Sequence, residues 1–162
     1  MVDPVVPPHI ERPLPLIKVV GVSASGKSTL VAALRLAGYH ARPVSQEHTS
    51  VPDLWRHFEV PRALIYLDVS LAAQQARRDD VSWSEAARHE EVRRLAHARE
   101  HADVVIDTSA LSASTISTLV LAWLSSQEIR HATAPLPIVG ATGAPLPTAG
   151  PRARPYGRSL AS

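Results

Sequence analysis

The sequence predicts an α/β protein in which a short, mostly parallel sheet lies between two layers of helices. Short apolar runs alternate with amphipathic segments between residues 16 and 126, and strands that alternate with helices form parallel sheets covered on both faces. The run "ALIYLDV" (63–69) is apolar at almost every position, as in a strand buried on both sides. Ligands of such folds bind at the carboxyl ends of the strands.

The first predicted strand is followed directly by a loop and a helix. "LIKVV" (16–20) is short and β-branched, which favours a strand. The segment "KSTLVAALRLAG" (27–38) has one apolar helical face, and Gly38 is typical of the position after a helix. The apolar residues of that face are Leu30, Val31, Leu34 and Ala37. A weaker strand is expected at residues 41–45.

The second half of the region continues the alternation. After the strand at 63–69, Ser70 can cap a helix that ends near the charged cluster "RRDD". "SWSE" (82–85) has the capping-box spacing and predicts a long, mostly exposed helix that runs to about His101. A last strand at 103–107 precedes a helix with a regular apolar stripe. The stripe consists of Ile116, Leu119, Val120, Trp123 and Leu124.

Both ends of the chain differ in composition from this domain, which spans residues 16–126. Residues 1–15 contain five prolines and predict an extended N-terminal arm. Residues 127–162 contain six prolines and four glycines with few large apolar side chains, so we expect a disordered tail.

Composition and charge exclude several classes of protein. The apolar content of 45% is typical of a folded domain, and the chain has no cysteine for disulfides or thiolate chemistry. The net charge of +2 divides into +3 on residues 127–162 and −1 on the rest, so a nucleic-acid partner is not expected. The longest apolar run, "LVLAWL", is too short to cross a bilayer, and the N-terminus has no signal-peptide pattern. We expect a cytoplasmic protein without a membrane partner.

The stretch "GVSASGKST" (21–29) completes the pattern GxxxxGK[ST] between a strand and a helix. Such a loop points successive backbone N–H groups at one site, where the positive end of the helix dipole also lies. Lys27 would reach the β- and γ-phosphates of a nucleoside triphosphate, and the Ser28 hydroxyl would bind Mg²⁺. The strand before and the helix after weaken the alternative, a surface turn with a helix cap. The predicted nucleotide-binding residues are Gly21, Val22, Ser23, Ala24, Ser25, Gly26, Lys27, Ser28 and Thr29.

This loop resembles that of the small P-loop kinases of the adenylate kinase, shikimate kinase and adenylylsulfate kinase type. "RALIYLDVSLAAQQARR" looks like the strand and helix that precede their LID, and "HADVVIDTSALSASTISTLVLAWL" looks like their terminal strand and helix, near the adenine. The resemblance covers residues 16–125 and implies a three-layer P-loop NTPase fold. It also implies transfer of the γ-phosphoryl group of ATP, with Mg²⁺, to a hydroxyl acceptor. Ala24 stands where many of these loops have glycine.

The resemblance implies roles for four further residues besides Lys27. Asp68, at the end of its strand, would help to hold Mg²⁺, and Glu47 would accept the proton of the attacking hydroxyl. Arg77 and Arg78 would reach the phosphates or stack on adenine, with Arg88 a weaker candidate. Other readings stay open: Asp68 can stabilise the helix that begins after Ser70, and the arginines can pair with Asp79 and Asp80 at a solvated helix end.

One departure from the family is the length of the region that binds the acceptor. Only residues 46–62 separate the second strand from "ALIYLDV", where the family has another strand and a helical region. The segment 78–84 is likewise short for a LID. Either the acceptor is small, or the protein is a nucleotide-binding interaction module or an NTP hydrolase. Of Trp55 and Phe58 in this region, one is expected to pack on the sheet. His97 and His101 have a metal-compatible spacing but no third ligand, so an exposed helix face is expected there.

Overall fold

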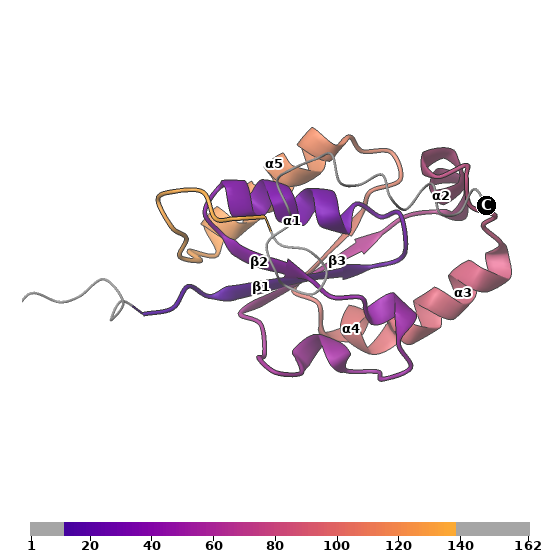
Figure 1. Cartoon of the computed structure of the whole chain (residues 1–162), viewed down its shortest axis with the longest axis horizontal. Coiled ribbons are helices and arrows are strands. Elements are labelled where there is room, and N and C mark those ends of the chain that lie inside the picture. Colours follow the sequence, from indigo (N-terminus) through magenta and orange to yellow (C-terminus); the bar gives the residue numbers. More distant parts are fainter. Residues whose placement is uncertain (1–11, 139–162) are drawn as a thin grey trace, which may run out of the picture.

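The computed structural model describes residues 12–138 and contains a four-stranded sheet in which every neighbouring pair is parallel (Figure 1). The strands lie in the order β2-β1-β3-β4. Their bounds are β1 (Leu16–Gly21), β2 (His40–Pro43), β3 (Ala63–Asp68) and β4 (Val104–Asp107). The expected α/β class with a short parallel sheet is therefore confirmed, and all four strands end at one edge.

Helices cover both faces of this sheet, as a three-layer α/β/α arrangement requires (Figure 1). Helices α1 (Lys27–Leu36) and α5 (Ala113–Ser126) pack on one face. Helices α3 (Glu85–Arg94) and α4 (Ala96–His101) lie on the other, and α2 (Leu71–Arg77) follows β3. The chain between β2 and β3 contains two single-turn 3₁₀ helices, η2 (Gln46–His48) and η3 (Leu54–Arg56).

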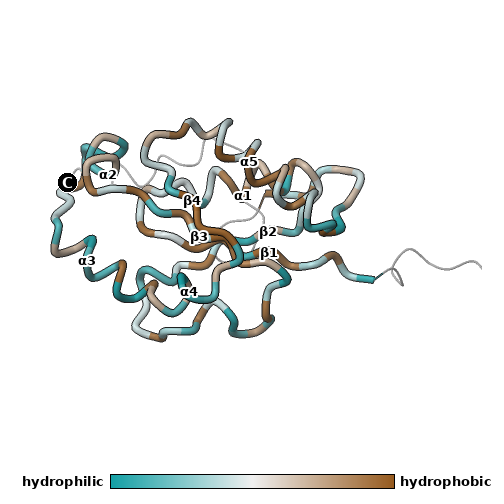
Figure 2. Tube along the Cα trace, turned by 180° about the vertical axis from the view of Figure 1, so that it is seen from behind, coloured by the Kyte–Doolittle hydropathy of each residue, from teal (hydrophilic) through white to brown (hydrophobic). Residues whose placement is uncertain are grey.

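Alternate residues of the central strands supply two separate cores. Ile17 and Val19 of β1 face α1 and α5, whereas Val20 faces the side covered by α4. Every residue of β1 is buried, which explains why its sequence is apolar on both faces except at Lys18. Figure 2 shows hydrophobic segments in the central strands around β3 and β4, with many hydrophilic segments around them.

The long helix expected from residue 82 differs from the observed one in its start and in its continuity. The cap is Ser84, whose hydroxyl accepts a hydrogen bond from the N–H of Ala87 at 3.0 Å, so the capping-box prediction that begins at Ser82 is wrong. The helix also stops at Arg94 and restarts at Ala96. Between them Leu95 is completely buried, and the break lets this side chain reach the second core.

Residues 127–138, which the sequence places in a disordered tail, pack along α1. Ile129 is buried. The N–H of Ala132 donates to the Gly38 carbonyl and the N–H of Leu136 donates to the Arg35 carbonyl, each at 2.8 Å. Gly38 has a φ of +96°, and a Cβ on it would come within 2.1 Å of the Ala132 carbonyl oxygen. The N-terminal arm up to residue 11 and the tail from residue 139 lie outside the described residues. Within residues 12–138, no helix has the length and apolar character needed to span a membrane.

Candidate functional site

The loop of residues 21–29 connects the end of β1 to the first turn of α1. Two of its residues have left-handed backbone conformations, Ala24 with a φ of 63° and Gly26 with a φ of 102°. Gly21 has no room for a side chain, because a Cβ there would lie 2.3 Å from the Leu67 carbonyl oxygen. Two glycines of the motif are thus required by geometry. The left-handed Ala24 occupies the position where the resembling loops have glycine, and a single methyl group keeps the strain small.

Lys27 folds back over this loop and meets a carboxylate from the segment that follows the neighbouring strand. Its Nζ donates to the carbonyl oxygens of Gly21 at 2.8 Å and Val22 at 3.1 Å. The same Nζ lies 2.8 Å from Oε2 of Glu47. Glu47 is in η2, just after β2, and β2 pairs directly with β1. This adjacency of the two strands brings the predicted lysine and the predicted general base together.

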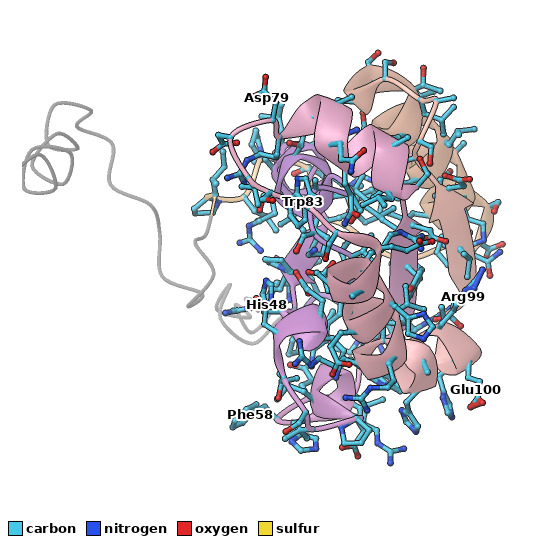
Figure 3. All side chains as sticks on the ribbon, turned by 90° about the vertical axis from the view of Figure 1, so that its right-hand side faces the viewer. His48, Phe58, Asp79, Trp83, Arg99 and Glu100 are labelled. Carbon is cyan, nitrogen blue, oxygen red and sulfur yellow. The ribbon has the colours of Figure 1, made fainter. Side chains whose placement is uncertain are left out.

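Glu47 is almost completely buried, with 3% of its surface exposed. Its Oε2 contacts Lys27 and lies 3.5 Å from Nε2 of the exposed His48, which Figure 3 shows at the rim of the molecule. Its Oε1 has no hydrogen-bond partner among the described residues. Leaving a buried carboxylate oxygen unpaired is costly, so this atom is suited to a ligand, a water or a cation.

Asp68, at the end of β3, makes a different set of contacts. Its Oδ1 accepts hydrogen bonds from the N–H of Val69 at 2.9 Å and from the guanidinium of Arg88 at 3.1 Å. Arg88 also donates to the carbonyl of Val69 at 3.0 Å. Among the interactions of the described residues there is no hydrogen bond or ion pair between the Asp68 carboxylate and Lys27. The metal-binding role of Asp68 therefore stays a prediction, and the structure adds Arg88 as its partner.

The two adjacent arginines of α2 have different environments. Arg77 donates to the carbonyl of Ala24 at 2.7 Å and to both the hydroxyl and the carbonyl of Thr108, so it ties the loop to the end of β4. Arg78 is exposed and pairs with Asp80, with Nε 3.0 Å from Oδ1. This ion pair raises the pKa of Arg78 and lowers that of Asp80. The ion pair between Arg78 and Asp80 lies at the surface and is weak, so a ligand can replace it. The guanidinium of Arg77 is instead held by the loop and Thr108.

Three residues that hold the loop were not found from the sequence. Thr108, completely buried after β4, has its Oγ1 within 3.0 Å of the carbonyl oxygens of Ser25 and Asp68. Gln74 donates to the Ser23 carbonyl at 2.9 Å. Glu91 of α3 accepts hydrogen bonds from both the N–H and the hydroxyl of Ser23. Only Glu91 has a sequence signal, since it lies midway between Arg88 and Arg94 with helical spacing.

Two cavities lie on either side of the loop. The first, of about 310 Å³, has a largely apolar lining that includes Leu30, Leu111 and Ile116 beside Gly26 and Arg77. The second, of about 730 Å³, has a mixed lining with more polar than apolar residues, and it is named the polar cavity. Its polar residues are Ser23, Lys27, Ser28, Thr29, Ser45, Glu47, His48 and Arg78. Arg78 and the loop residues Ala24 and Thr29 line both cavities.

The two aromatic residues of the 46–62 region are divided as expected. Trp55 is buried, and its indole N–H donates to Nδ1 of His97 at 3.0 Å. Phe58 is fully exposed with a φ of 69°, and Figure 3 shows its ring directed away from the protein. His97 and His101 stack with ring centroids 4.3 Å apart. The described residues contain no group of three or more His, Cys, Asp or Glu side chains arranged to hold a metal.

The fold and the site together define an α/β protein with a glycine-containing loop between the first strand of a parallel sheet and the first helix. Comparisons with protein-family models and with curated proteins give no match for this chain.

Proposed function

We propose that this protein binds Mg·ATP at residues 21–29 and transfers the γ-phosphoryl group to a hydroxyl of a small acceptor. The observation that carries this proposal is the pair formed by Lys27 and the buried Glu47 at the wall of the 730 Å³ cavity. A cation for the terminal phosphates and a carboxylate for the acceptor hydroxyl are two of the charged groups that phosphoryl-transfer sites use. The resemblance to P-loop kinases supports the same assignment.

The nucleotide fits the loop in one orientation. The loop precedes the N-terminus of α1, whose first-turn N–H groups and dipole favour anions. The apolar 310 Å³ cavity lies beside Gly26 and Leu30 and suits a nucleobase. The polar cavity lies beside Lys27 on the other side and suits the terminal phosphate and the acceptor. Arg78 lines both cavities and is placed to contact the phosphates between them.

The residues present also fit a magnesium ion held jointly with the nucleotide. Mg²⁺ sites in phosphoryl-transfer proteins use one or two carboxylates together with phosphate oxygens and waters. The Ser28 hydroxyl and the unpaired Oε1 of Glu47 line or border the same cavity. The ion would neutralise charge on the phosphate oxygens during transfer. Asp68 is the alternative carboxylate, and it would take the metal role where Glu47 serves as the general base.

Glu47 has a defined part in the transfer step. When Lys27 moves to the phosphates, the Glu47 carboxylate loses its counterion and faces the acceptor cavity. It then takes the proton of the acceptor hydroxyl as that oxygen bonds to the γ-phosphorus, and the bond to the β-phosphate oxygen breaks to release ADP. The donors at the loop and Lys27 stabilise the charge on the transferred group.

Hydrolysis of ATP is a second candidate, and the short connection between β2 and β3 favours it. That connection folds only into η2 and η3, and its large side chains Trp55 and Gln46 are buried inside it. Few side chains therefore remain to enclose an acceptor, and water would enter the polar cavity readily. In this case Glu47 would orient a water molecule.

ADP formation from Mg·ATP tests the proposal and separates the two candidates. The protein is incubated with a panel of nucleosides, sugars and small hydroxy acids, and ADP is measured with and without each compound. A rise with one acceptor supports the kinase, and acceptor-independent ADP supports the hydrolase. Lys27→Ala should remove both nucleotide binding and turnover. Arg93→Ala, an exposed change on α3 away from the loop, is the control; binding that survives Lys27→Ala at the control level would refute the site.

A further inference from the structure

Glu91 holds the side of the loop where the terminal phosphate is expected. Its two carboxylate oxygens accept from Ser23, Oε1 from the N–H at 3.1 Å and Oε2 from the hydroxyl at 2.5 Å. Ser23 lines the polar cavity together with Lys27 and Ser28. Since the lysine of loops with this pattern reaches the β- and γ-phosphates, and Ser23 shares a cavity with Lys27, we expect Ser23 at the γ end of a bound nucleotide.

The charge of Glu91 is not neutralised by an ion pair with any described residue. Only 8% of its surface is exposed. The arginines one turn away on α3 are engaged elsewhere, Arg88 with Asp68 and Arg94 with Glu90. The two donors of Ser23 compensate the negative charge of Glu91. One of them is a backbone N–H of the kind that binds anions in such loops.

We propose that Glu91 determines the preference of this site for the diphosphate over the triphosphate form of the nucleotide. This inference rests on the proposed nucleotide site. The carboxylate occupies donors at the γ end of the loop and places a negative charge there. A γ-phosphate must therefore displace it from Ser23 or bind against its repulsion, whereas a nucleoside diphosphate ends before this position.

The position of α3 gives Glu91 a way to release Ser23. On the same helix face Arg88 holds the end of β3, and Arg94 donates to the Glu47 carbonyl at 3.3 Å. A shift of α3 that withdraws Glu91 also moves the backbone that carries Glu47. We therefore expect the triphosphate, but not the diphosphate, to change the hydrogen exchange rates of the backbone amides of α3.

Calorimetric titration of ATP and ADP, each with Mg²⁺, tests the proposal on the wild type, Glu91→Gln and Glu85→Gln. Glu85 lies on the same helix, is exposed and changes the net charge equally, so it is the matched control. We expect Glu91→Gln to raise the ATP affinity relative to the ADP affinity by about tenfold, as removal of a nearby like charge predicts. Glu85→Gln should leave the ratio unchanged.

An unchanged ratio, or an equal loss of both affinities, in Glu91→Gln would overturn the inference and make Glu91 a structural residue only. Should this variant fail to fold by circular dichroism, Ser23→Ala replaces it. That change removes the hydroxyl that anchors Glu91 and should raise the ratio by a smaller factor; no rise would overturn the inference. Absence of any nucleotide binding by the wild type would instead refute the proposed function, so the two failures are distinguishable.

Discussion

The side chain of Thr108 links the two sides of the candidate site, because its hydroxyl oxygen lies 3.0 Å from the carbonyl oxygen of Ser25 in the loop after β1. The same hydroxyl accepts a hydrogen bond from Arg77 at 3.1 Å. A residue at the end of β4 therefore fixes both the loop and the arginine that holds it.

Replacement of Thr108 by valine should loosen the loop without changing the shape of the core. The change removes the hydroxyl from a completely buried position and leaves the carbonyl of Ser25 with one donor fewer. We expect a loss of about 1–3 kcal/mol in the free energy of unfolding, measured in urea. Thr118→Val, an exposed change on α5, is the control. Equal stability of the two variants would show that Thr108 does not support the loop.

The pair of Lys27 and Glu47 should appear as a coupling in a double-mutant cycle. Lys27→Ala leaves the buried Glu47 carboxylate without its cation, and we expect it to cost about 3 kcal/mol of stability in addition to nucleotide binding. Adding Glu47→Gln removes the buried charge and should restore part of that loss. Additive effects of the two changes on the denaturation midpoint would contradict a direct pair.

The magnesium dependence of nucleotide binding should identify the carboxylate that holds the ion. If Glu47 acts there, Glu47→Gln raises the Mg²⁺ concentration needed for half-maximal binding by about tenfold or more, since loss of a site carboxylate typically weakens metal binding that much. Asp68→Asn should then have a small effect, because Arg88 and the N–H of Val69 already engage Asp68. The opposite pattern would return the metal role to Asp68.

Tyr66 should make the protein sensitive to alkaline pH. Burial, helped by the nearby Asp68, raises the pKa of this phenol from 10.0 to about 12. Between these values the unfolded chain loses a proton that the folded protein keeps, so stability falls as pH rises from 10 towards 12. Tyr66→Phe should remove about 2 kcal/mol of this loss at pH 11.5. The test compares urea midpoints of both proteins at pH 8 and pH 11.5, and an equal decline in both would exclude Tyr66 as the cause.

The sequence predicted the strands and helices well because each is encoded locally. The buried run at 63–69, the apolar stripe of α5 and the loop motif all have recognisable periods or residue types. The start of α3 was less predictable, since Ser82 and Ser84 are equally good caps by residue type. The structure shows that only Ser84 accepts the N–H of the following turn. The break at Leu95 follows from burial in the second core, a tertiary effect without a local pattern.

The site was predictable where it lies on the loop motif and much less so elsewhere. The pairing of β2 directly with β1, which places Glu47 beside Lys27, is a matter of strand order and cannot be read from either residue. Thr108 and Gln74 act through single hydrogen bonds between segments far apart in the chain. Isolated polar residues of this kind carry no sequence signal, and their roles become visible only when the strand ends are brought together.

The segment that follows α5 has a practical consequence for work with shorter forms of this protein. A chain ended at Ser126, where the composition changes, would lose the buried Ile129 and also Ala132, whose N–H donates to the Gly38 carbonyl. It would lose as well the Pro137 carbonyl to which Arg35 donates. It would also lose Ile138 from the wall of the polar cavity. A truncation at this point would therefore uncover the outer side of α1 and widen the polar cavity, so a loss of nucleotide binding in the shorter form would trace to the missing segment rather than to the loop.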